Sequence, residues 1–270
     1  MAERSKGDGT VGKALEVLDQ IASFERPVKF SELLDASPFP KATLYRFVQT
    51  LTNQGMLSHD SERGTYALGV RLVRLAHAAW QQSSLAPIAR PYVESLASDV
   101  GETVHLAQLD HAQVLYVDKR NPQNPIEMFS SAGKIGPAYC TGVGKAMMAY
   151  LEEPELSLIL DQQSYHKFTE KTLVTQESLR AELREIREHG YGFDREEHEP
   201  GIICVAVPIL LNSGRPLGAL SVTSSKERQS LASLERLVPR IEQAAKAISG
   251  DAVYWQFPDQ TRQTEKVGTE

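Results

Sequence analysis

The clearest pattern of apolar and polar positions lies between residues 31 and 55. Its second half holds four apolar residues at the three-and-four spacing that places side chains on one face of a helix: Leu44, Phe47, Val48 and Leu51. Pro40 precedes this stripe and Gly55 follows it, as is typical of the first turn and the left-handed cap of a helix. The pattern predicts two short helices around a Pro-containing turn, the second with one buried face.

The opposite face of this second helix is polar. At about 100° per residue, it carries Ala42, Arg46, Gln49 and Asn53 and is flanked by Thr43 and Tyr45, while Lys41 lies in the first turn. The candidate DNA contacts of this helix are Lys41, Ala42, Thr43, Tyr45, Arg46 and Gln49. In a helix-turn-helix, the N-terminal part of the second helix meets base edges. Arginine and lysine there can bond guanine or phosphate, and threonine can bond phosphate or touch a thymine methyl group. The alternative is an ordinary amphipathic helix whose polar face is solvated.

A pair of short strands follows this helix. Residues 56–59 and 65–68 have strand-like composition, and the polar turn between them holds Arg63 and Gly64. Upstream, the apolar positions of residues 11–22 predict a further helix. Three helices and a wing indicate a winged helix-turn-helix. We therefore expect double-stranded DNA as a partner, with Arg63 as a further contact.

Charge limits how this domain can bind DNA. Residues 1–80 contain ten Lys or Arg residues against nine Asp or Glu residues, and the whole chain has a formal net charge of −6. Binding dominated by phosphate neutralisation is expected of a strongly basic domain. We therefore expect a few placed side chains and more than one copy of the chain per site. The alternative is a winged helix that contacts another protein.

Length and composition predict two cores. The 270 residues with 41% apolar content accommodate a small N-terminal core and a larger second one. We expect a winged helix at residues 1–69, a linker helix at 70–84, a second domain at 85–257 and a disordered tail at 258–270. The apolar stripe of the linker helix either mediates a dimer contact or packs within its own subunit.

The chain shows no feature of a membrane or secreted protein. No apolar run reaches membrane-spanning length and the N-terminus is polar, so we expect a cytoplasmic protein without a membrane partner. Cys140 and Cys204 lie far apart and form no Cys-x-x-Cys motif. A disulfide scaffold or a structural zinc cluster is therefore not expected.

Short β-rich runs begin after Gly101. Strands are predicted at residues 103–109, 113–119, 126–131, 202–211 and 217–224. Helices are predicted at residues 141–151, 176–188 and 230–249, with another that ends near Gly101. Helices that interrupt a mainly antiparallel sheet indicate the α+β class, in an arrangement that holds a small ligand on one sheet face.

Five motifs together resemble the IclR family of bacterial transcriptional regulators over nearly the whole chain: Lys41-Ala-Thr-Leu-Tyr-Arg46, Tyr66-Ala-Leu-Gly69, Gly101-Glu-Thr-Val-His105, Thr141-Gly-Val-Gly-Lys-Ala146 and Asp194-Arg-Glu-Glu-His-Glu-Pro-Gly-Ile-Ile-Cys-Val-Ala-Val-Pro-Ile209. The resemblance implies an N-terminal winged helix, a linker helix and a C-terminal, GAF-like effector-binding domain. It also implies dimers or tetramers on palindromic operators, and is nearest to regulators of sugar-acid or small organic-acid catabolism.

The same resemblance implies an effector site in the C-terminal domain. Its candidate residues are Met128, Gly142, Val143, Asp194, Ile202, Cys204, Ser221 and Thr223. Gly142 and Val143 would offer backbone N–H groups at a helix N-terminus, which suits a carboxylate. Ser221 and Thr223 alternate along a strand, so both hydroxyls point to one face. A small hydroxylated or oxo acid fits this chemistry, although each strand residue alone is more often a packed core residue.

Two positions depart from the common family pattern. Thr223 stands where serine is frequent, and Val143 stands where a smaller residue is frequent. Both changes bear on the size of the implied site, so the resemblance leaves the identity of the effector open.

Catalytic and metal sites are the alternatives to an effector site. Thr141-Gly-Val-Gly-Lys145 lacks the first glycine and the final hydroxyl residue of a phosphate-binding loop. The acidic run from Asp194 to Glu199 is more simply a solvated loop than paired catalytic carboxylates. Metal binding through some of Cys140, Cys204, His105, Asp194 and His198 stays open, but their spacing matches no standard ligand motif. We expect no enzyme activity, no cofactor and no metal.

These observations predict a repressor of a catabolic operon whose DNA binding responds to a small acidic metabolite. The motivating feature is one DNA-reading module joined through a helix to one domain that carries a pocket. The alternative is a ligand-binding sensor whose winged helix serves protein contact, which the near-neutral charge of residues 1–80 favours.

Overall fold

The computed structural model describes residues 9–83 and 85–253 of the chain. The disordered tail predicted at residues 258–270 lies outside the described residues. The chain divides into two compact units, which we call the N-terminal unit (Met1–Gln82) and the C-terminal unit (Ser83–Glu270).

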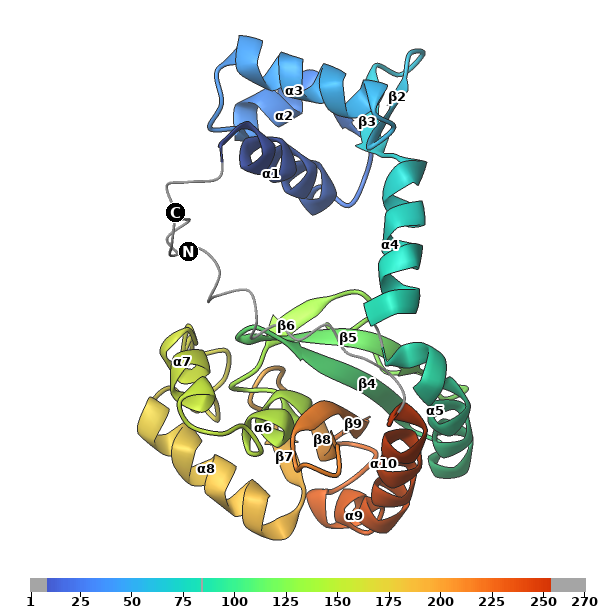
Figure 1. The fold of residues 1–270 in the computed structure, drawn as a ribbon, viewed down its shortest axis with the longest axis vertical. Helices are drawn as coiled ribbons and strands as arrows, with labels where there is room; N and C mark the ends of the chain where they lie inside the picture. The colour runs from blue at the N-terminus through green and yellow to red at the C-terminus, as the bar shows by residue number, and fades with distance from the viewer. Residues whose placement is uncertain (1–8, 84, 254–270) are drawn as a thin grey trace. The chain divides into compact units, whose positions relative to one another are not determined.

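The N-terminal unit consists of helices and a small sheet (Figure 1). Its elements are α1 (Gly9–Ser23), β1 (Val28–Lys29), α2 (Phe30–Ala36), α3 (Lys41–Asn53), β2 (Leu57–Asp60), β3 (Thr65–Leu68) and α4 (Val70–Ser83). The strands pair antiparallel in the order β1-β3-β2. The winged helix-turn-helix is confirmed, although the first wing strand covers residues 57–60 rather than 56–59.

The buried stripe of α3 anchors it in the core of this unit. Leu44, Phe47, Val48 and Leu51 are buried as predicted. Gly55 has a φ of 70°, which confirms the left-handed cap, because residues with a Cβ rarely adopt this conformation. A Cβ on Gly69 would lie 2.2 Å from the Gly55 carbonyl oxygen. Glycine at both positions therefore lets the end of the wing approach the end of α3.

The helix predicted for the linker is present as α4. Arg71 near its start joins α4 to the end of α3, because its Nη1 donates to the Gln54 carbonyl at 2.9 Å. None of the side chains described in α4 is fully buried, and Val70 and Val73 are 74% and 67% exposed. On α1, Val11 is 72% exposed. The N-terminal unit thus presents apolar side chains that its own core does not cover.

The C-terminal unit is built on a six-stranded antiparallel sheet in the order β6-β5-β4-β9-β8-β7. Its elements are α5 (Ala86–Val100), β4 (Thr103–Asp110), β5 (Gln113–Arg120), β6 (Ile135–Pro137), α6 (Gly142–Met148), α7 (Glu155–Asp161), α8 (Gln176–His189), β7 (Gly192–Arg195), β8 (Ile202–Leu210), β9 (Pro216–Ser225), α9 (Leu231–Glu235) and α10 (Val238–Ala252). The predicted α+β class, with helices flanking an antiparallel sheet, is confirmed.

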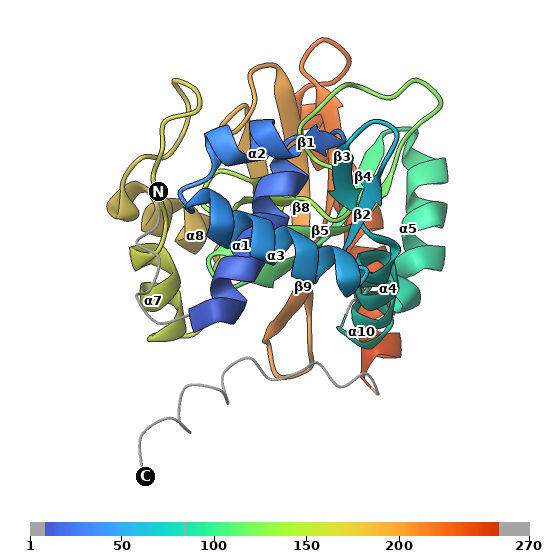
Figure 2. The same cartoon turned by 90° about the horizontal axis from the view of Figure 1, so that it is seen from above.

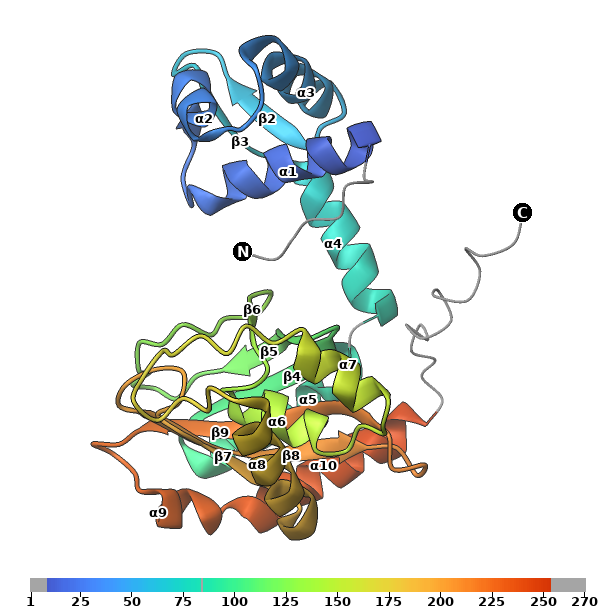
Figure 3. The same cartoon turned by 90° about the vertical axis from the view of Figure 1, so that its left-hand side faces the viewer.

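Helices cover both faces of this sheet. Helices α5 and α10 pack against each other, as Figure 2 shows, and against β4 and β8. Helix α6 contacts α8 and the strands β8 and β9, and Figure 3 shows α6 and α10 on opposite sides of the sheet. One hydrophobic core of this unit lies on the α6 side, where buried residues of α6, α7 and α8 meet Ala107, Ala206 and Ala219 of the sheet.

Two of the helices and strands predicted in this unit are wrong. Residues 126–131 form no strand, because their backbone groups bond side chains instead of a neighbouring strand. The Phe129 N–H donates to the Glu199 carboxylate, and Lys119 Nζ donates to the Ser130 carbonyl at 2.7 Å. The helix predicted at residues 230–249 is divided into α9 and α10, because Pro239 lacks the N–H that a continuous helix needs.

Three short elements of the C-terminal unit were not predicted: β6, α7 and β7. Each is at most seven residues long, which is too short for a periodic pattern to identify. None of the helices in the described part of the chain is long and apolar enough to span a membrane.

Candidate functional site

Helix α3 and the wing present the predicted DNA-contacting residues at the surface. Lys41, Ala42, Tyr45 and Arg46 on α3 and Arg63 in the wing turn are exposed, whereas Thr43 and Gln49 are half-buried. The Tyr45 ring packs edge-on against Phe30 of α2 at 5.8 Å between ring centroids. This contact joins the exposed face of α3 to the start of α2.

The basic side chains on this surface are available for a partner. Among the described residues, no carboxylate pairs with Lys41 or Arg46. Arg63 lies 3.8 Å from Asp60, and both side chains are largely exposed, so their attraction is weak. All seven predicted residues thus belong to one winged helix, and its recognition helix carries two cations that no described carboxylate neutralises.

The eight predicted effector contacts surround one cavity of about 30 Å³ in the C-terminal unit. Its wall is made of His105, Tyr116, Met128, Ser130, Thr141, Gly142, Val143, Asp194, His198, Glu199, Ile202, Cys204, Ser221 and Thr223. Six of these residues were not predicted as effector contacts. A water molecule needs about 10–15 Å³ measured in this way, so the cavity has room for about two waters.

The sheet register explains how residues distant in sequence reach this cavity. Asp194 on β7 pairs with Cys204 on β8, and Cys204 pairs with Thr223 on β9. Ser221 on β9 pairs with His105 on β4. Directly opposed residues in an antiparallel sheet point to the same face, so four strands contribute side chains to one polar floor.

Helix α6 closes the cavity from above the floor. A Cβ on Gly142 would lie 2.5 Å from Cys204 Sγ, so glycine is needed for the helix to approach β8. Thr141 precedes the helix in an extended conformation, and its hydroxyl donates to the Pro137 carbonyl at 2.8 Å. The first N–H groups of a helix have no partner within it, and Gly142 and Val143, which begin α6, both line the cavity.

Asp194 is a buried carboxyl with an unusual ionisation. Burial, together with the negative charge of Glu197, raises the pKa of Asp194 to about 7. The Glu197 N–H donates to Asp194 Oδ1 at 2.7 Å. Near neutral pH, Asp194 is therefore present in both protonation states, and its protonated form can donate a hydrogen bond.

Behind Asp194 lies a buried ion cluster. Lys145 on α6 is fully buried, and its Nζ bonds the Glu197 carboxylate and, at 3.1 Å, Glu182 on α8. Burial alone would lower the pKa of Lys145, but Glu197 and Glu182 outweigh it and raise that pKa. The prediction of a solvated acidic loop is wrong for Asp194 and Glu197, because both are buried as partners in this polar network.

The segment 126–131 covers another side of the cavity through Met128 and Ser130. The Glu199 carboxylate accepts the Phe129 N–H at 3.0 and 3.1 Å, and the Phe129 ring packs edge-on against His198 at 5.3 Å. These contacts hold the segment down. Because the enclosed space fits only about two waters, entry of a larger molecule requires part of this wall to move.

The buried thiols do not resemble reactive cysteines. Burial raises the pKa of Cys204 to about 12, and burial with the charge of Asp194 also raises that of Cys140. Both side chains are therefore thiols, whereas the nucleophile and the metal ligand are thiolates. Within the described residues, no group of three His, Cys, Asp or Glu side chains is placed to hold a metal ion.

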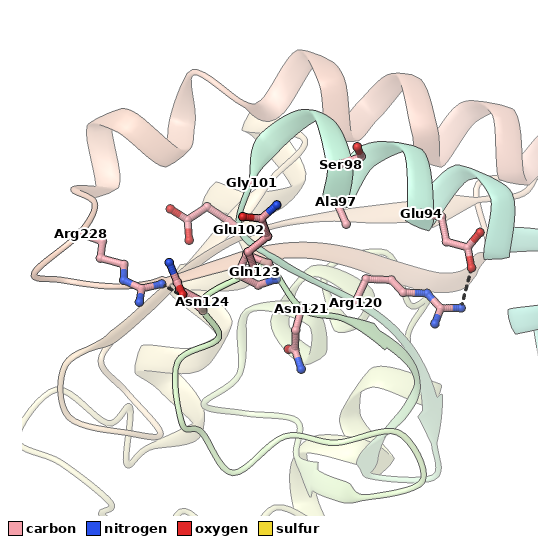
Figure 4. A pocket seen from close by; sticks show the side chains of 11 residues that line it. Glu94, Ala97, Ser98, Gly101, Glu102, Arg120, Asn121, Gln123, Asn124 and Arg228 are labelled. Carbon is pink, nitrogen blue, oxygen red and sulfur yellow. Dashed lines mark hydrogen bonds and ion pairs between the residues drawn. The ribbon is translucent and has the colours of Figure 1, made fainter.

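A larger and more open hollow of about 710 Å³ lies elsewhere on the C-terminal unit, between α5 and residues 120–124 (Figure 4). Its arginines already have partners. Arg120 pairs with Glu94 at 3.1 Å, and Arg228 donates to the Asn124 carbonyl at 2.7 Å. None of the predicted site residues lines this hollow.

Comparison with known proteins identifies relatives over nearly the whole chain. The model of the family described as "Bacterial transcriptional regulator IclR C-terminal" matches residues 77–250, and that of the "IclR helix-turn-helix domain" matches residues 10–61. The HTH-type transcriptional regulator KdgR of Escherichia coli K12 is 32% identical, over 95% of this chain and 98% of its own. The transcriptional repressor IclR of the same strain is 29% identical, over 80% of each chain.

A solved structure shares the fold. An IclR homologue from Microbacterium hydrocarbonoxydans, crystallised as a complex with 4-hydroxybenzoate, matches with a TM-score of 0.78 at 22% identity, over 90% of this chain and 98% of that chain. The resemblance seen in the motifs is thus supported by two family models and by relatives that are transcriptional regulators. The C-terminal family model matches more than half of this chain, so the chain belongs to the IclR family of bacterial transcriptional regulators.

Proposed function

We propose that this chain represses a catabolic operon, and that a small organic acid in the cavity of the C-terminal unit modulates its binding to a palindromic operator. The observation that carries the proposal is the combination of an exposed recognition helix and a polar cavity lined by all eight predicted effector contacts. The chain then acts as a regulator and has no catalytic role.

The chemistry of the cavity supports an acid as the effector. The Gly142 and Val143 N–H groups at the start of α6 can donate to a carboxylate. The protonated form of Asp194 can donate as well, because its pKa is about 7. Hydroxyl groups of Ser221 and Thr223 complete a wall that suits a hydroxylated or oxo acid. The relative from Microbacterium hydrocarbonoxydans, which carries 4-hydroxybenzoate, offers an example of such a ligand.

The surface of the N-terminal unit supports self-association. Val11 on α1 and Val70 and Val73 on α4 are more than two-thirds exposed, and exposed apolar side chains that gather on helices are typical of protein contacts. A dimer or tetramer would place two recognition helices on the two halves of a palindrome. This arrangement would also compensate for the near-neutral charge of residues 1–80.

Control by an effector requires only a modest coupling free energy between the cavity of the C-terminal unit and the DNA-binding surface of the N-terminal unit. A coupling free energy of about 1–3 kcal/mol changes affinity by about 5- to 150-fold. We propose that the acid favours one of two arrangements of the subunits, and that α4 carries this preference to the spacing of the paired recognition helices.

Gel-shift titrations test the proposal with DNA that flanks the gene and a panel of small hydroxy and oxo acids. We expect Arg46→Ala to weaken operator binding by about 5- to 150-fold. Arg184→Ala, which removes an exposed arginine from α8 of the C-terminal unit, is the matched control and should leave operator affinity unchanged. Unchanged affinity for Arg46→Ala would contradict the assignment of α3.

The response to the acid is tested separately. Ser221→Ala should bind the operator like the wild type and respond less to the acid. If calorimetry shows that acids bind but none alters operator affinity, the proposed coupling is wrong. Operator affinity must also fall as salt rises, and affinity that is independent of salt would favour a winged helix that contacts protein.

A further inference from the structure

His105 is a buried side chain on the cavity wall to which the proposed function assigns no role. It lies in β4, opposite Ser221 of β9, and is 2% exposed. Its Nε2 lies 2.8 Å from Ser130 Oγ, and its Nδ1 lies 3.2 Å from Thr223 Oγ1 and 3.4 Å from Ser221 Oγ. His105 therefore connects the two floor hydroxyls with the segment that covers the cavity.

The ring of His105 is neutral under physiological conditions. Burial, followed in size by the positive charge of Lys119, lowers its pKa to about 3. A neutral imidazole has one donor and one acceptor nitrogen, while a serine or threonine hydroxyl can both donate and accept. Because the three contacts of this ring are hydroxyls, either tautomer satisfies them. The cluster can therefore offer a donor or an acceptor to a ligand.

Besides His105, the cavity wall carries two carboxyl groups and a second histidine, His198. Asp194 and Glu199 contribute carboxyl groups, and the wall contains no lysine or arginine. The nearby Lys119 donates to the Ser130 carbonyl at 2.7 Å and is not part of the wall. One carboxylate of a ligand can be received at the start of α6, but a second carboxylate would meet no lysine or arginine on the wall and would lie near Glu199, whose own carboxylate already lies 3.7 Å from His198 Nδ1.

We propose that His105, together with Ser221 and Thr223, determines effector specificity by binding an uncharged hydroxyl or keto group of a monocarboxylic acid. This inference rests on the proposed function, because it assumes that the cavity receives the acid. It predicts that the protein selects hydroxy and oxo monocarboxylic acids over plain monocarboxylic acids and over dicarboxylic acids.

Calorimetry with matched acids tests this assignment on the full chain. The probes are lactate with propionate, 4-hydroxybenzoate with benzoate, and succinate as a dicarboxylic acid. For the wild type we expect the hydroxylated member of at least one pair to bind about tenfold tighter, since one hydrogen bond to a buried polar group has about this effect. Succinate should bind more weakly than that hydroxylated acid.

Two substitutions of His105 separate recognition from structural support. His105→Phe keeps a ring but removes both nitrogens, and should bring the affinity ratio of the pair to within about twofold. His105→Asn keeps a polar group close to the position of Nδ1 and should retain most of the ratio. A purely structural role would weaken both acids equally and leave their ratio unchanged, so the ratio remains informative even if His105→Phe is less stable.

Each outcome has a defined meaning. A wild-type ratio that persists in His105→Phe would overturn the role of His105 and leave the proposed function intact. Equal binding of both members of every pair to the wild type, or succinate as the tightest ligand, would overturn the inference in the same way. If none of the five acids binds the wild type or alters its operator affinity, both the inference and an acid effector fail.

Discussion

Replacing Asp194 with asparagine removes an ionisable group from the cavity wall while keeping its shape. Asparagine retains the Oδ1 acceptor for the Glu197 N–H, which lies at 2.7 Å. Burial and the charge of Glu197 raise the pKa of Asp194 from 3.8 to about 7. The folded protein therefore holds a proton on Asp194 at pH values where the unfolded chain has already lost it.

The sign and size of the effect follow from this difference. Between pH 3.8 and about 7, the folded state binds more protons, so the free energy of unfolding falls as pH rises. At about 1.4 kcal/mol per pKa unit, the full loss is about 4 kcal/mol. Between pH 5 and pH 8, about two pH units lie below the raised pKa. The unfolding free energy of the wild type therefore falls by about 3 kcal/mol over this range. The asparagine side chain in Asp194→Asn does not titrate, so the variant escapes this loss.

Urea denaturation of the full chain at pH 5 and pH 8, followed by circular dichroism, measures the effect. Relative to the wild type, Asp194→Asn should gain about 3 kcal/mol of unfolding free energy between the two pH values. The comparison cancels the contributions of groups that titrate alike in both proteins. Asp161→Asn, at an exposed position on α7, is the control and should change by less than about 0.5 kcal/mol. If the unfolding free energies of Asp194→Asn and wild type differ by the same amount at pH 5 and at pH 8, the pKa of Asp194 is not raised.

Two further substitutions test packing in each unit. Leu44→Ala should lower the unfolding free energy of the N-terminal unit by about 3 kcal/mol in urea, because Leu44 is fully buried. Leu15→Ala, at a half-exposed position on α1 of the same unit, is its control, and equal effects would contradict the assigned core. Gly142→Ala should abolish acid binding in calorimetry while sparing operator binding, because its Cβ would lie 2.5 Å from Cys204 Sγ. Wild-type affinity for acids in this variant would contradict the close approach of α6 to β8.

The apolar pattern predicted those helices and strands whose buried face and end signals lie within one short segment of the chain. Helix α3 was predicted with both ends because its buried stripe, the preceding Pro40 and the left-handed Gly55 all lie within one short segment. Strands β4, β5, β8 and β9 were found within a few residues of their ends, because each is a run of at least eight residues bounded by turns. In these cases local preference and tertiary packing agree.

The residues that pattern missed depend on contacts between distant parts of the chain. The segment 126–131 resembled a strand, but its backbone bonds Glu199, which is 70 residues from Phe129. Lys145 lies on a short helix and is buried because Glu197, 52 residues away, neutralises it. His105 was predicted as a possible metal ligand and not as an effector contact, and its place in the cavity follows from the register of β4 with β9. The periodicity of apolar residues describes only local structure, so it cannot predict contacts between residues that are far apart in the sequence.

Helix α6 links the cavity to the buried ion cluster, so a ligand bound in the cavity can change the electrostatics of that cluster. This one helix carries Gly142 at the cavity and Lys145 in the buried ion cluster. Glu197 accepts from Lys145 and donates its N–H to Asp194, while Glu182 ties the same lysine to α8. A carboxylate received at Gly142 would favour the protonated form of Asp194 and so change the charge that Glu197 and Lys145 face. That change in charge reaches groups on both helices, because Lys145 of α6 also pairs with Glu182 of α8.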